Sequence, residues 1–236
     1  SVIDINGNLS IGGSARLDAN ADISLAGNWS VTSSNGDAFD QGTGALLVTF
    51  DGSTDQTITH TGGEVFNRVA VAKPGGNVIL NNPITISAGT GTDLTLTQGK
   101  IISTLTNIIT VSDEATSNGG DADSYVDGPI VKLGEDAFIF PTGNGNYWAR
   151  IGITPSGAGN TTSFTAQYFA SSPPNTSSLS GVARVSTIEY WQLTRANAIT
   201  NNNVVTLYWE SGTRSRITDI TPTSNLFVAR LDGTNW

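Results

Sequence analysis

Residues Asp93–Val111, DLTLTQGKIISTLTNIITV, contain the pattern that decides the fold of this chain. An apolar residue, a small hydroxyl residue and a second apolar residue form Leu94-Thr95-Leu96, and after a break at Gly99 the pattern returns as Ile109-Thr110-Val111. Because successive side chains of a strand point to opposite faces, the two apolar side chains share one face and the hydroxyl group lies on the other. Each tripeptide therefore predicts a short, half-buried β-strand.

The same tripeptide recurs through the first half of the chain, as Leu9-Ser10-Ile11, Ile23-Ser24-Leu25 and Ile84-Thr85-Ile86. Gly, Asn or Asp follows each copy within about two to six residues and predicts a turn there. A strand this short cannot bury its apolar face alone, so we expect such strands to stack on one another. The pattern favours a right-handed parallel β-helix, which is a solenoid; an antiparallel sandwich is the alternative.

Composition and charge agree with an all-β protein and argue against several classes of partner. Hydrophobic residues make up 37% of the 236 residues and charged residues only 13%, with 27 Gly, and no segment before residue 112 has a helical period. The formal net charge of −9 would repel a phosphate backbone, which makes nucleic acid an unsuitable partner. The chain has no Cys, so disulfides and thiolate sites are excluded. No apolar run approaches the roughly 20 residues of a membrane helix, so no membrane insertion is expected.

Both ends of the sequence look like cut ends. The chain contains no Met, so we expect residue 1 not to be a native start. Leu226–Leu231 has the pattern of a strand, and Asp232-Gly233 predicts a turn whose hairpin partner would lie beyond Trp236. We therefore expect a processed or excised piece of a larger protein, incomplete at its C-terminal end.

The strand pattern changes near residue 134. Before it the expected strands are short: Val2–Ile5, Leu9–Ile11, Ile23–Leu25, Trp29–Val31, Ala45–Phe50, Gln56–Thr59, Phe66–Val71, Val78–Leu80 and Ile84–Ile86, followed by those of the opening stretch. After it they are longer and more aromatic: Ala137–Phe140, Trp148–Ile153, Ser163–Phe169, Ser186–Leu193, Val204–Glu210 and Leu226–Leu231. Their irregular spacing suggests an antiparallel β-sandwich. We predict a β-solenoid over residues 1–133 and a β-sandwich over residues 134–236.

Several phrases, in this order along the chain, carry a resemblance to a known class of protein. They are Gly27-Asn28-Trp29, Val48-Thr49-Phe50-Asp51-Gly52, Phe66-Asn67-Arg68-Val69, Leu94-Thr95-Leu96-Thr97-Gln98-Gly99-Lys100-Ile101, Ser124-Tyr125-Val126-Asp127-Gly128-Pro129, Phe138-Ile139-Phe140-Pro141-Thr142-Gly143, Gln167-Tyr168-Phe169 and Glu189-Tyr190-Trp191-Gln192-Leu193. Together they resemble the surface-exposed repeat-and-sandwich region of large secreted proteins of Bacteroidota that the type IX secretion system exports. The resemblance implies a β-helix capped by a sandwich, an extracellular location at the cell surface, contact with the secretion machinery and a structural or adhesive role. It carries over no catalytic residue.

An acidic loop provides the best candidate for a cation site. It contains Asp113, Glu114, Asp121, Asp123 and Asp127. Hard cations such as Ca²⁺ bind several oxygen ligands, and two carboxylates at alternate positions, as in Asp121-Ala122-Asp123, supply two of them. The spacing lacks the bidentate Glu of an EF-hand, and a solvated acidic loop between two domains is the alternative.

Aromatic side chains are the candidates for glycan binding. Tyr-Trp pairs occur at Tyr147-Trp148, Tyr190-Trp191 and Tyr208-Trp209. Neighbours on a strand point to opposite faces, so one member of each pair should be exposed and could stack on a sugar ring. The candidates are Trp148, Tyr190, Trp191 and Trp209, and packing in the sandwich core is the alternative.

Features of an enzyme are weak in this sequence. His60 is the only His, so a Ser-His-Asp triad would need it, and a surface position in the turn Thr59–Gly63 is the simpler interpretation. Most acidic residues before residue 60 lie at turns, where Asp usually forms local hydrogen bonds. We predict a non-enzymatic structural or adhesive module. We expect no resident cofactor, and Ca²⁺ is the only candidate ion. Its partners would be other segments of the same surface protein, neighbouring subunits or glycans. A glycan-binding module or polysaccharide-active enzyme, and a subunit of a surface filament, are the alternatives.

Overall fold

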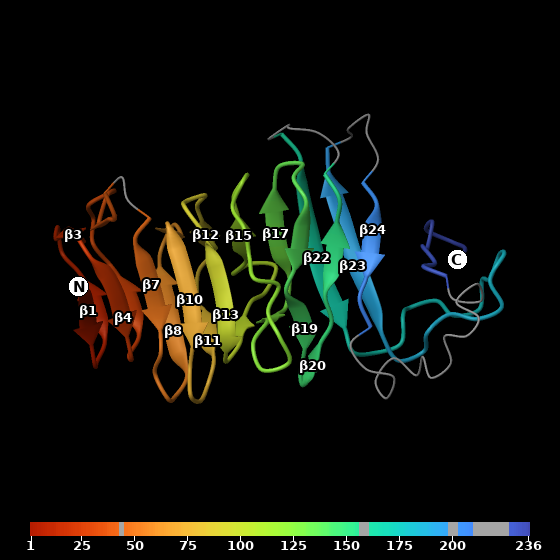
Figure 1. Ribbon diagram of the computed structural model, residues 1–236, viewed down its shortest axis with the longest axis horizontal. Helices are drawn as coiled ribbons and strands as arrows, with labels where there is room; N and C mark the ends of the chain where they lie inside the picture. Colours follow the sequence, from red (N-terminus) through yellow and green to blue (C-terminus); the bar gives the residue numbers. More distant parts are fainter. Residues whose placement is uncertain (43–44, 156–160, 198–202, 210–226) are drawn as a thin grey trace.

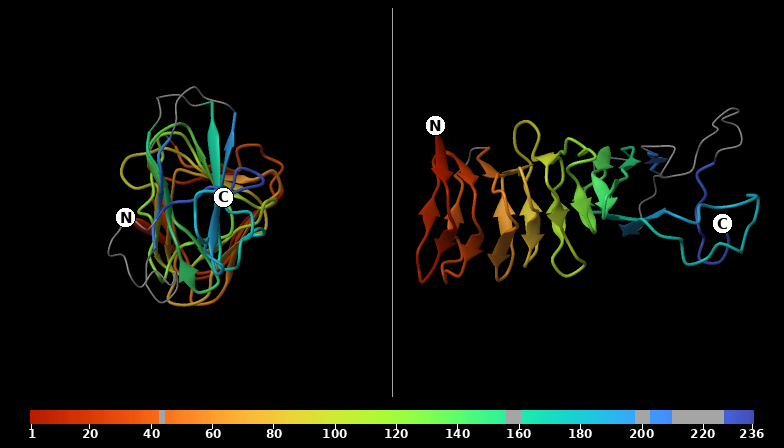
Figure 2. Two further views of the ribbon diagram at one scale, coloured as in Figure 1. Left: turned by 90° about the vertical axis from the view of Figure 1, so that its right-hand side faces the viewer. Right: turned by 90° about the horizontal axis from the view of Figure 1, so that it is seen from below.

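A computed structural model describes residues 1–42, 45–155, 161–197, 203–209 and 227–236. All regular secondary structure in these ranges is β, and they contain no helix of the length and apolar character needed to cross a membrane. The strands lie side by side along one long axis, with the N-terminus at one end (Figure 1). Seen along that axis, the chain winds around a central core (Figure 2). The prediction of an all-β protein is thus confirmed.

Three long sheets run along the axis. The first contains β1 (Val2–Ile5), β4 (Asp22–Leu25), β7 (Leu47–Phe50), β10 (Arg68–Ala72) and β13 (Leu94–Gln98). The second contains β2 (Leu9–Ile11), β5 (Trp29–Val31), β8 (Gln56–His60), β11 (Val78–Leu80), β14 (Ile101–Ile102), β16 (Val126–Asp127), β19 (Thr142–Asn144) and β20 (Tyr147–Trp148). The third contains β9 (Glu64–Phe66), β12 (Ile84–Ile86), β15 (Ile109–Val111), β17 (Ile130–Leu133), β22 (Ser163–Phe169) and β23 (Tyr190–Ala196).

Two smaller sheets complete the described structure. One pairs β3 (Leu17–Asp18) with β6 (Phe39–Asp40), and the other joins β18 (Phe138–Phe140), β21 (Ile151–Ile153) and β24 (Val205–Leu207). Strands as short as β3 and β6 lie below the length at which an alternating pattern can be recognised, so the sequence did not predict them.

The strands form a parallel β-solenoid of about six turns, each called a rung below. Ile23 pairs with Val48, Val48 with Val69, and Val69 with Leu94, so successive rungs are 25 (48 − 23), 21 (69 − 48) and 25 (94 − 69) residues long. The tripeptides Ile84–Ile86, Leu94–Leu96 and Ile109–Val111 belong to alternate sheets, and their spacings of 10 and 15 residues sum to one rung of 25. The parallel stacking predicted from these tripeptides is confirmed.

The core follows from the alternation within each tripeptide. In β4, Ile23 and Leu25 are 1% and 0% exposed, while Ser24 between them is only partly buried. The widest side chain of the core, Trp29, packs edge-on against Phe39 and Phe66, with ring centroids 4.7 and 5.1 Å apart. Edge-to-face contacts of this kind add to the area that aromatic residues bury, so this cluster is a centre of stability.

Side chains at the corners join each rung to the next one. The Leu47 amide donates to Asp22 Oδ1 at 2.9 Å, the Thr57 amide to Asn28 Oδ1 at 2.8 Å, and the Asn77 amide to Asp55 Oδ1 at 2.8 Å. The local hydrogen bond predicted for turn Asp residues occurs at Asp40, whose Oδ1 accepts the Gly42 amide at 2.7 Å, whereas the three bonds above cross from one rung to the next. Backbone groups at the corners find partners in this way without a strand on each side.

One predicted strand is wrong, because the structure divides it between two sheets. Phe66–Val71 was expected as one strand with imperfect alternation, but β9 ends at Phe66 and β10 begins at Arg68. Asn67 lies at the corner between the third and the first sheet, and its amide donates to Gln41 Oε1 at 2.8 Å. The alternation fails at Asn67 because the chain changes sheets there.

Beyond β17 most strand pairs are antiparallel, although β19 still pairs in parallel with β16. β17 pairs in parallel with β15 and antiparallel with β22, and β22 pairs antiparallel with β23. Figure 1 shows β22 and β23 beside β17, as a continuation of the solenoid's own sheet. The predicted sandwich over residues 134–236, and the boundary at residue 134, therefore stay predictions.

The expected strand ends in this region need correction. β23 begins at Tyr190 and not at Ser186, and β24 covers Val205–Leu207, with Glu210 outside the described residues. Residues 227–231 form no strand, and Leu226 lies outside the described residues. The predicted turn is present, because the amides of Thr234 and Asn235 donate to Asp232 Oδ1 at 3.2 and 2.8 Å.

Candidate functional site

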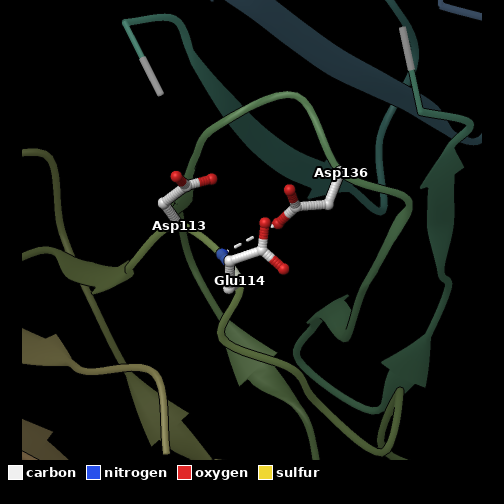
Figure 3. Close-up of side chains that lie close together, drawn as sticks. All are labelled: Asp113, Glu114 and Asp136. Carbon is white, nitrogen blue, oxygen red and sulfur yellow. Dashed lines mark hydrogen bonds between the residues drawn. The ribbon is translucent and has the colours of Figure 1, made fainter. Parts of the chain in front are cut away.

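The acidic residues that come closest together are Asp113, Glu114 and Asp136, which lie on two loops of neighbouring rungs. One carboxylate oxygen from each lies within 4.8 Å of the others, and the described residues contain no second such group of three acids. Figure 3 shows their carboxylates turned toward one another, with the Glu114 amide donating to Asp136 Oδ2 at 2.9 Å. These three acids and Lys132 are together called the acidic junction below.

Two local backbone features build this junction. Glu114 has a φ of +62°, a conformation that non-glycine residues adopt infrequently, and it closes the tight loop after β15. Gly134 has a φ of +88°, and a Cβ there would lie 1.8 Å from Asp113 Oδ1. A side chain at position 134 would displace the Asp113 carboxylate, so Gly134 permits the close approach of the two loops.

A buried lysine already supplies positive charge to the junction. Lys132 Nζ lies 2.7 Å from Asp136 Oδ2 and donates to the carbonyl oxygens of Ser112 and Leu133, both at 2.7 Å. All three donors of the ammonium group are thereby used. Three carboxylates and one ammonium leave a formal charge of −2, which attracts cations, but Ca²⁺ takes six to eight oxygen ligands and these acids supply only part of that set.

The other predicted cation ligands lie apart from the junction. Asp121 Oδ1 accepts the Asp123 amide at 2.8 Å, which closes a short turn. Asp127 accepts from Asn144 Nδ2 at 3.0 Å and from the Gly145 amide at 2.8 Å. The structure thus brings Asp113 and Glu114 to Asp136 and places Asp121, Asp123 and Asp127 elsewhere.

Sequence analysis missed Asp136, although the repeat contained a signal for it. Asp136 follows Asp113 by 23 residues (136 − 113), which is one rung, as in the bridge between Leu94 and Ser117. Residues one rung apart lie beside each other in a solenoid. The prediction grouped acids by nearness in the sequence, whereas the fold groups them by the repeat length.

Three of the four predicted glycan-binding aromatic residues make contacts within the protein. Trp148 Nε1 donates to the Gly119 carbonyl at 3.2 Å, and the Arg150 guanidinium lies 4.4 Å from its ring centroid. Tyr190 stacks on Phe169 with centroids 4.6 Å apart, and Trp191 Nε1 donates to the Ala149 carbonyl at 3.1 Å. Trp209 is 44% exposed and is therefore the most accessible member of the set.

His60 lies at the end of β8, partly buried, and not in a surface turn as predicted. Its Nδ1 lies 3.3 Å from Glu64 Oε2, which also accepts a hydrogen bond from Trp29 Nε1 at 2.8 Å. Burial raises the pKa of the Glu64 carboxyl, and the Trp29 hydrogen bond and the His60 charge oppose that rise. The arrangement places a titratable pair beside the aromatic core of the solenoid.

A second buried lysine, Lys73, directly follows β10 and reaches the corner between β7 and β8 of the preceding rung. Lys73 Nζ donates to the carbonyl oxygens of Gly52 and Thr54 at 2.9 Å and to Gln56 Oε1 at 2.5 Å. Burial lowers the pKa of Lys73, while the carboxylates of Asp55 and Asp51 oppose the decrease. Lys73 and Gln56 are fully buried and serve as polar links between rungs.

Comparison of this chain with known proteins finds no matching family model, no matching curated protein and no matching solved structure.

Proposed function

We propose that this chain is a non-enzymatic structural or adhesive module of a larger extracellular protein at the cell surface. The proposal rests on one observation: polar side chains along the solenoid form hydrogen bonds to the backbone of neighbouring rungs. Asp22, Asn28 and Asp55 bind backbone amides of the next rung, and Lys73 binds backbone carbonyls. Functional groups that could do chemistry are thus engaged in holding rung to rung, as in a rigid spacer.

Repeat stacking supports this role physically. In a solenoid each rung contacts only its neighbours, so the length of the rod grows with the number of rungs while its cross-section stays constant. We further propose that the solenoid is right-handed and that the strands after residue 134 form a β-sandwich at its end. The resemblance to Bacteroidota proteins exported by type IX secretion supports the extracellular location.

Location and activity can be tested separately. Antibodies against residues 1–236 should label intact cells that produce the protein, and labelling only after permeabilisation would contradict the proposal. Incubation of the purified protein with a panel of polysaccharides should release no reducing ends. Release that survives repurification and disappears with Asp113→Asn or Glu64→Gln would favour an enzyme instead.

Glycan binding is a second candidate, favoured by the exposure of Trp209 and Tyr147, which are 44% and 43% exposed. Exposed aromatic rings stack on the apolar faces of sugars. If this function is real, Trp209→Ala should lose retention on a polysaccharide column and keep its melting temperature. Trp191→Ala is the matched control, since Trp191 packs against the core and its loss should lower stability instead.

A further inference from the structure

The outward face of the third sheet, whose strands all lie within the described residues, carries no charged side chain. Strands β12 to β23 of this sheet follow one another along the long axis, so the face lies on the flank of the rod (Figure 1). The charged residues of these strands are Glu64, Lys132 and Arg195. Glu64 and Lys132 are buried, and Arg195 is on the inner side because it pairs with the buried residue Phe164. A chain with a net charge of −9 thus has one broad neutral face.

A row of β-branched side chains crosses this face from strand to strand. The strand register places one outward residue of each strand in line: Val65, Thr85, Thr110, Val131, Thr165 and Thr194. Each of them is at least partly exposed, because its neighbours along the strand point to the inner side. Neighbouring strands lie about 4.8 Å apart, so the row spans roughly 24 Å. The face is therefore an uncharged strip that could follow an extended polymer.

Two stacked aromatic rings lie at one end of the same face. Phe169 on β22 and Tyr190 on β23 are directly opposite each other, and their rings are parallel to within 5° with centroids 4.6 Å apart. Both side chains are only partly buried, so the pair presents aromatic surface outward. Sugar rings stack on such surfaces through their apolar C–H faces, and Tyr adds a hydroxyl group.

Polar side chains lie directly beside these rings. Gln167 is opposite Gln192, and Thr165 is opposite Thr194, with both pairs on the outward face. Each Gln offers a carbonyl acceptor and an NH2 donor, and each Thr offers a hydroxyl group that donates and accepts. Within the described residues no hydrogen bond occupies these four side chains. Sugar hydroxyl groups require this mixture of donors and acceptors.

We propose that this face, centred on Gln167, Gln192 and the Phe169–Tyr190 pair, binds a neutral polysaccharide. The inference deepens the glycan-binding candidate above and rests on it, but it assigns a different surface. The exposed Tyr147 belongs to β20 of the second sheet, and Trp209 follows β24 of a smaller sheet.

The absence of charge on the face selects the ligand. A neutral sugar polymer loses no ionic hydration when it binds there. An acidic glycan would find no cation on the face and would approach a chain whose net charge is −9. A second copy of the chain would bring the same net charge and the same repulsion.

Affinity electrophoresis in native gels tests this binding. Hydroxyethyl cellulose, glucomannan and galactomannan serve as neutral probes, and alginate serves as the acidic probe. At least one neutral probe should retard the unmodified chain, and alginate should not. Retardation by alginate, or by none of the probes, would overturn the inference.

Single substitutions locate the surface. Gln192→Ala should raise the dissociation constant for the retarding probe about tenfold, the effect of losing one or two hydrogen bonds, and should keep the melting temperature because Gln192 is exposed. Tyr190→Ala should weaken binding at least as much by removing the stacking surface. Gln98→Ala is the matched control: Gln98 is an exposed Gln at the end of β13 in the first sheet, and its variant should bind like the unmodified chain.

The outcomes separate this inference from the proposed function. If Trp209→Ala loses retardation while Gln192→Ala keeps it, glycan binding stands and the face assigned here is wrong. If no probe retards the chain, and Thr110→Lys abolishes self-association in sedimentation equilibrium, the face joins copies of the chain and the inference is overturned. Surface labelling of intact cells still decides the extracellular role in either case.

Discussion

The parallel rungs and the antiparallel strands that follow them differ in how they bury their residues. In the rungs, strands of three residues such as β5, β12 and β15 bury both of their apolar side chains almost completely. In the antiparallel region β22 keeps strict alternation over seven residues, but every residue of β23, at the edge of the sheet, is at least partly exposed. A rung strand is buried because it has a neighbouring strand on each side. The greater length of β23 does not compensate for its position at the edge of the sheet.

The largest expected contrast concerns two tryptophans. Trp29→Ala in the solenoid should lower the free energy of unfolding by about 3–5 kcal/mol, because Trp29 is 0% exposed and lies at the centre of the aromatic cluster. Trp191→Ala in β23 should cost about 1–3 kcal/mol, since its side chain is only partly buried. Urea unfolding measures both, and equal losses would show that the two regions are packed alike.

Two glycines give the next contrast. A Cβ at Gly52 would lie 2.1 Å from the Ala26 carbonyl oxygen of the neighbouring rung, whereas one at Gly152 in β21 would meet its nearest atoms, in Tyr208, at 3.4 Å. Gly52→Ala should therefore destabilise the protein by about 3 kcal/mol, and Gly152→Ala should stay within about 1 kcal/mol of the unmodified chain. Thermal unfolding checks the order, and a tolerated Gly52→Ala would contradict close backbone packing between rungs.

A smaller effect, dependent on pH, is expected at Glu64. Its pKa is raised in the folded protein, chiefly by burial, above the ordinary value of 4.5. The folded state therefore binds more protons than the unfolded state in the window above 4.5, and the stability due to this group is lost as the pH rises through the folded pKa. Glu64→Gln mimics the protonated form and keeps an acceptor for Trp29 Nε1, so its melting temperature should exceed that of the unmodified chain above the window and match it below.

The antiparallel region supplies a control for that measurement. Glu189 is also buried, at 6% exposure, and accepts a hydrogen bond from Tyr168 Oη at 2.7 Å. Glu189→Gln shows what replacing a buried carboxylate beside an aromatic donor does in general. If the unmodified chain instead gains stability over Glu64→Gln as the pH rises, the ion pair with His60 dominates and the expected pH dependence has the wrong sign.

The smallest effect is expected at the acidic junction, where the two regions meet. Lys132 already provides a donor to Asp136 at 2.7 Å, so excess Ca²⁺ should leave the melting temperature as it is in EDTA. Calorimetry in the two buffers decides the matter. A rise that disappears in Asp113→Asn would establish a Ca²⁺ site at the junction, and a rise that persists would place the ion elsewhere.

Much of the fold could be predicted from the tripeptide pattern, because alternation in a short strand directly determines which side chains are buried. Ile23, Leu94 and Ile109 were identified in this way. The corner at Asn67 was not predicted. An interruption of the alternating pattern looks the same whether the chain changes sheets or a single strand alternates imperfectly. The antiparallel strands were placed with less accuracy, because their partners are set by long-range contacts and not by a repeat.

Only part of the candidate site could be predicted, because its residues come from two different rungs. Asp113 and Glu114 stand out as neighbours in an acidic loop, whereas Asp136 and Lys132 come from the next rung and follow a different local sequence. Exposure of an aromatic residue was harder still: Trp148 and Trp191 have the same Tyr-Trp context as Trp209, and only the tertiary contacts separate them.

The direction of the backbone hydrogen bonds has a mechanical consequence. Strands of successive rungs pair along the long axis, so tension applied between the ends of the rod acts on one row of bonds at a time and peels the rungs in order. Each released rung of 21 residues, as between Val48 and Val69, would add roughly 70 Å of extended chain. Under load such a rod would lengthen one rung at a time, in steps set by rungs of 21 or 25 residues, and its remaining rungs would stay folded.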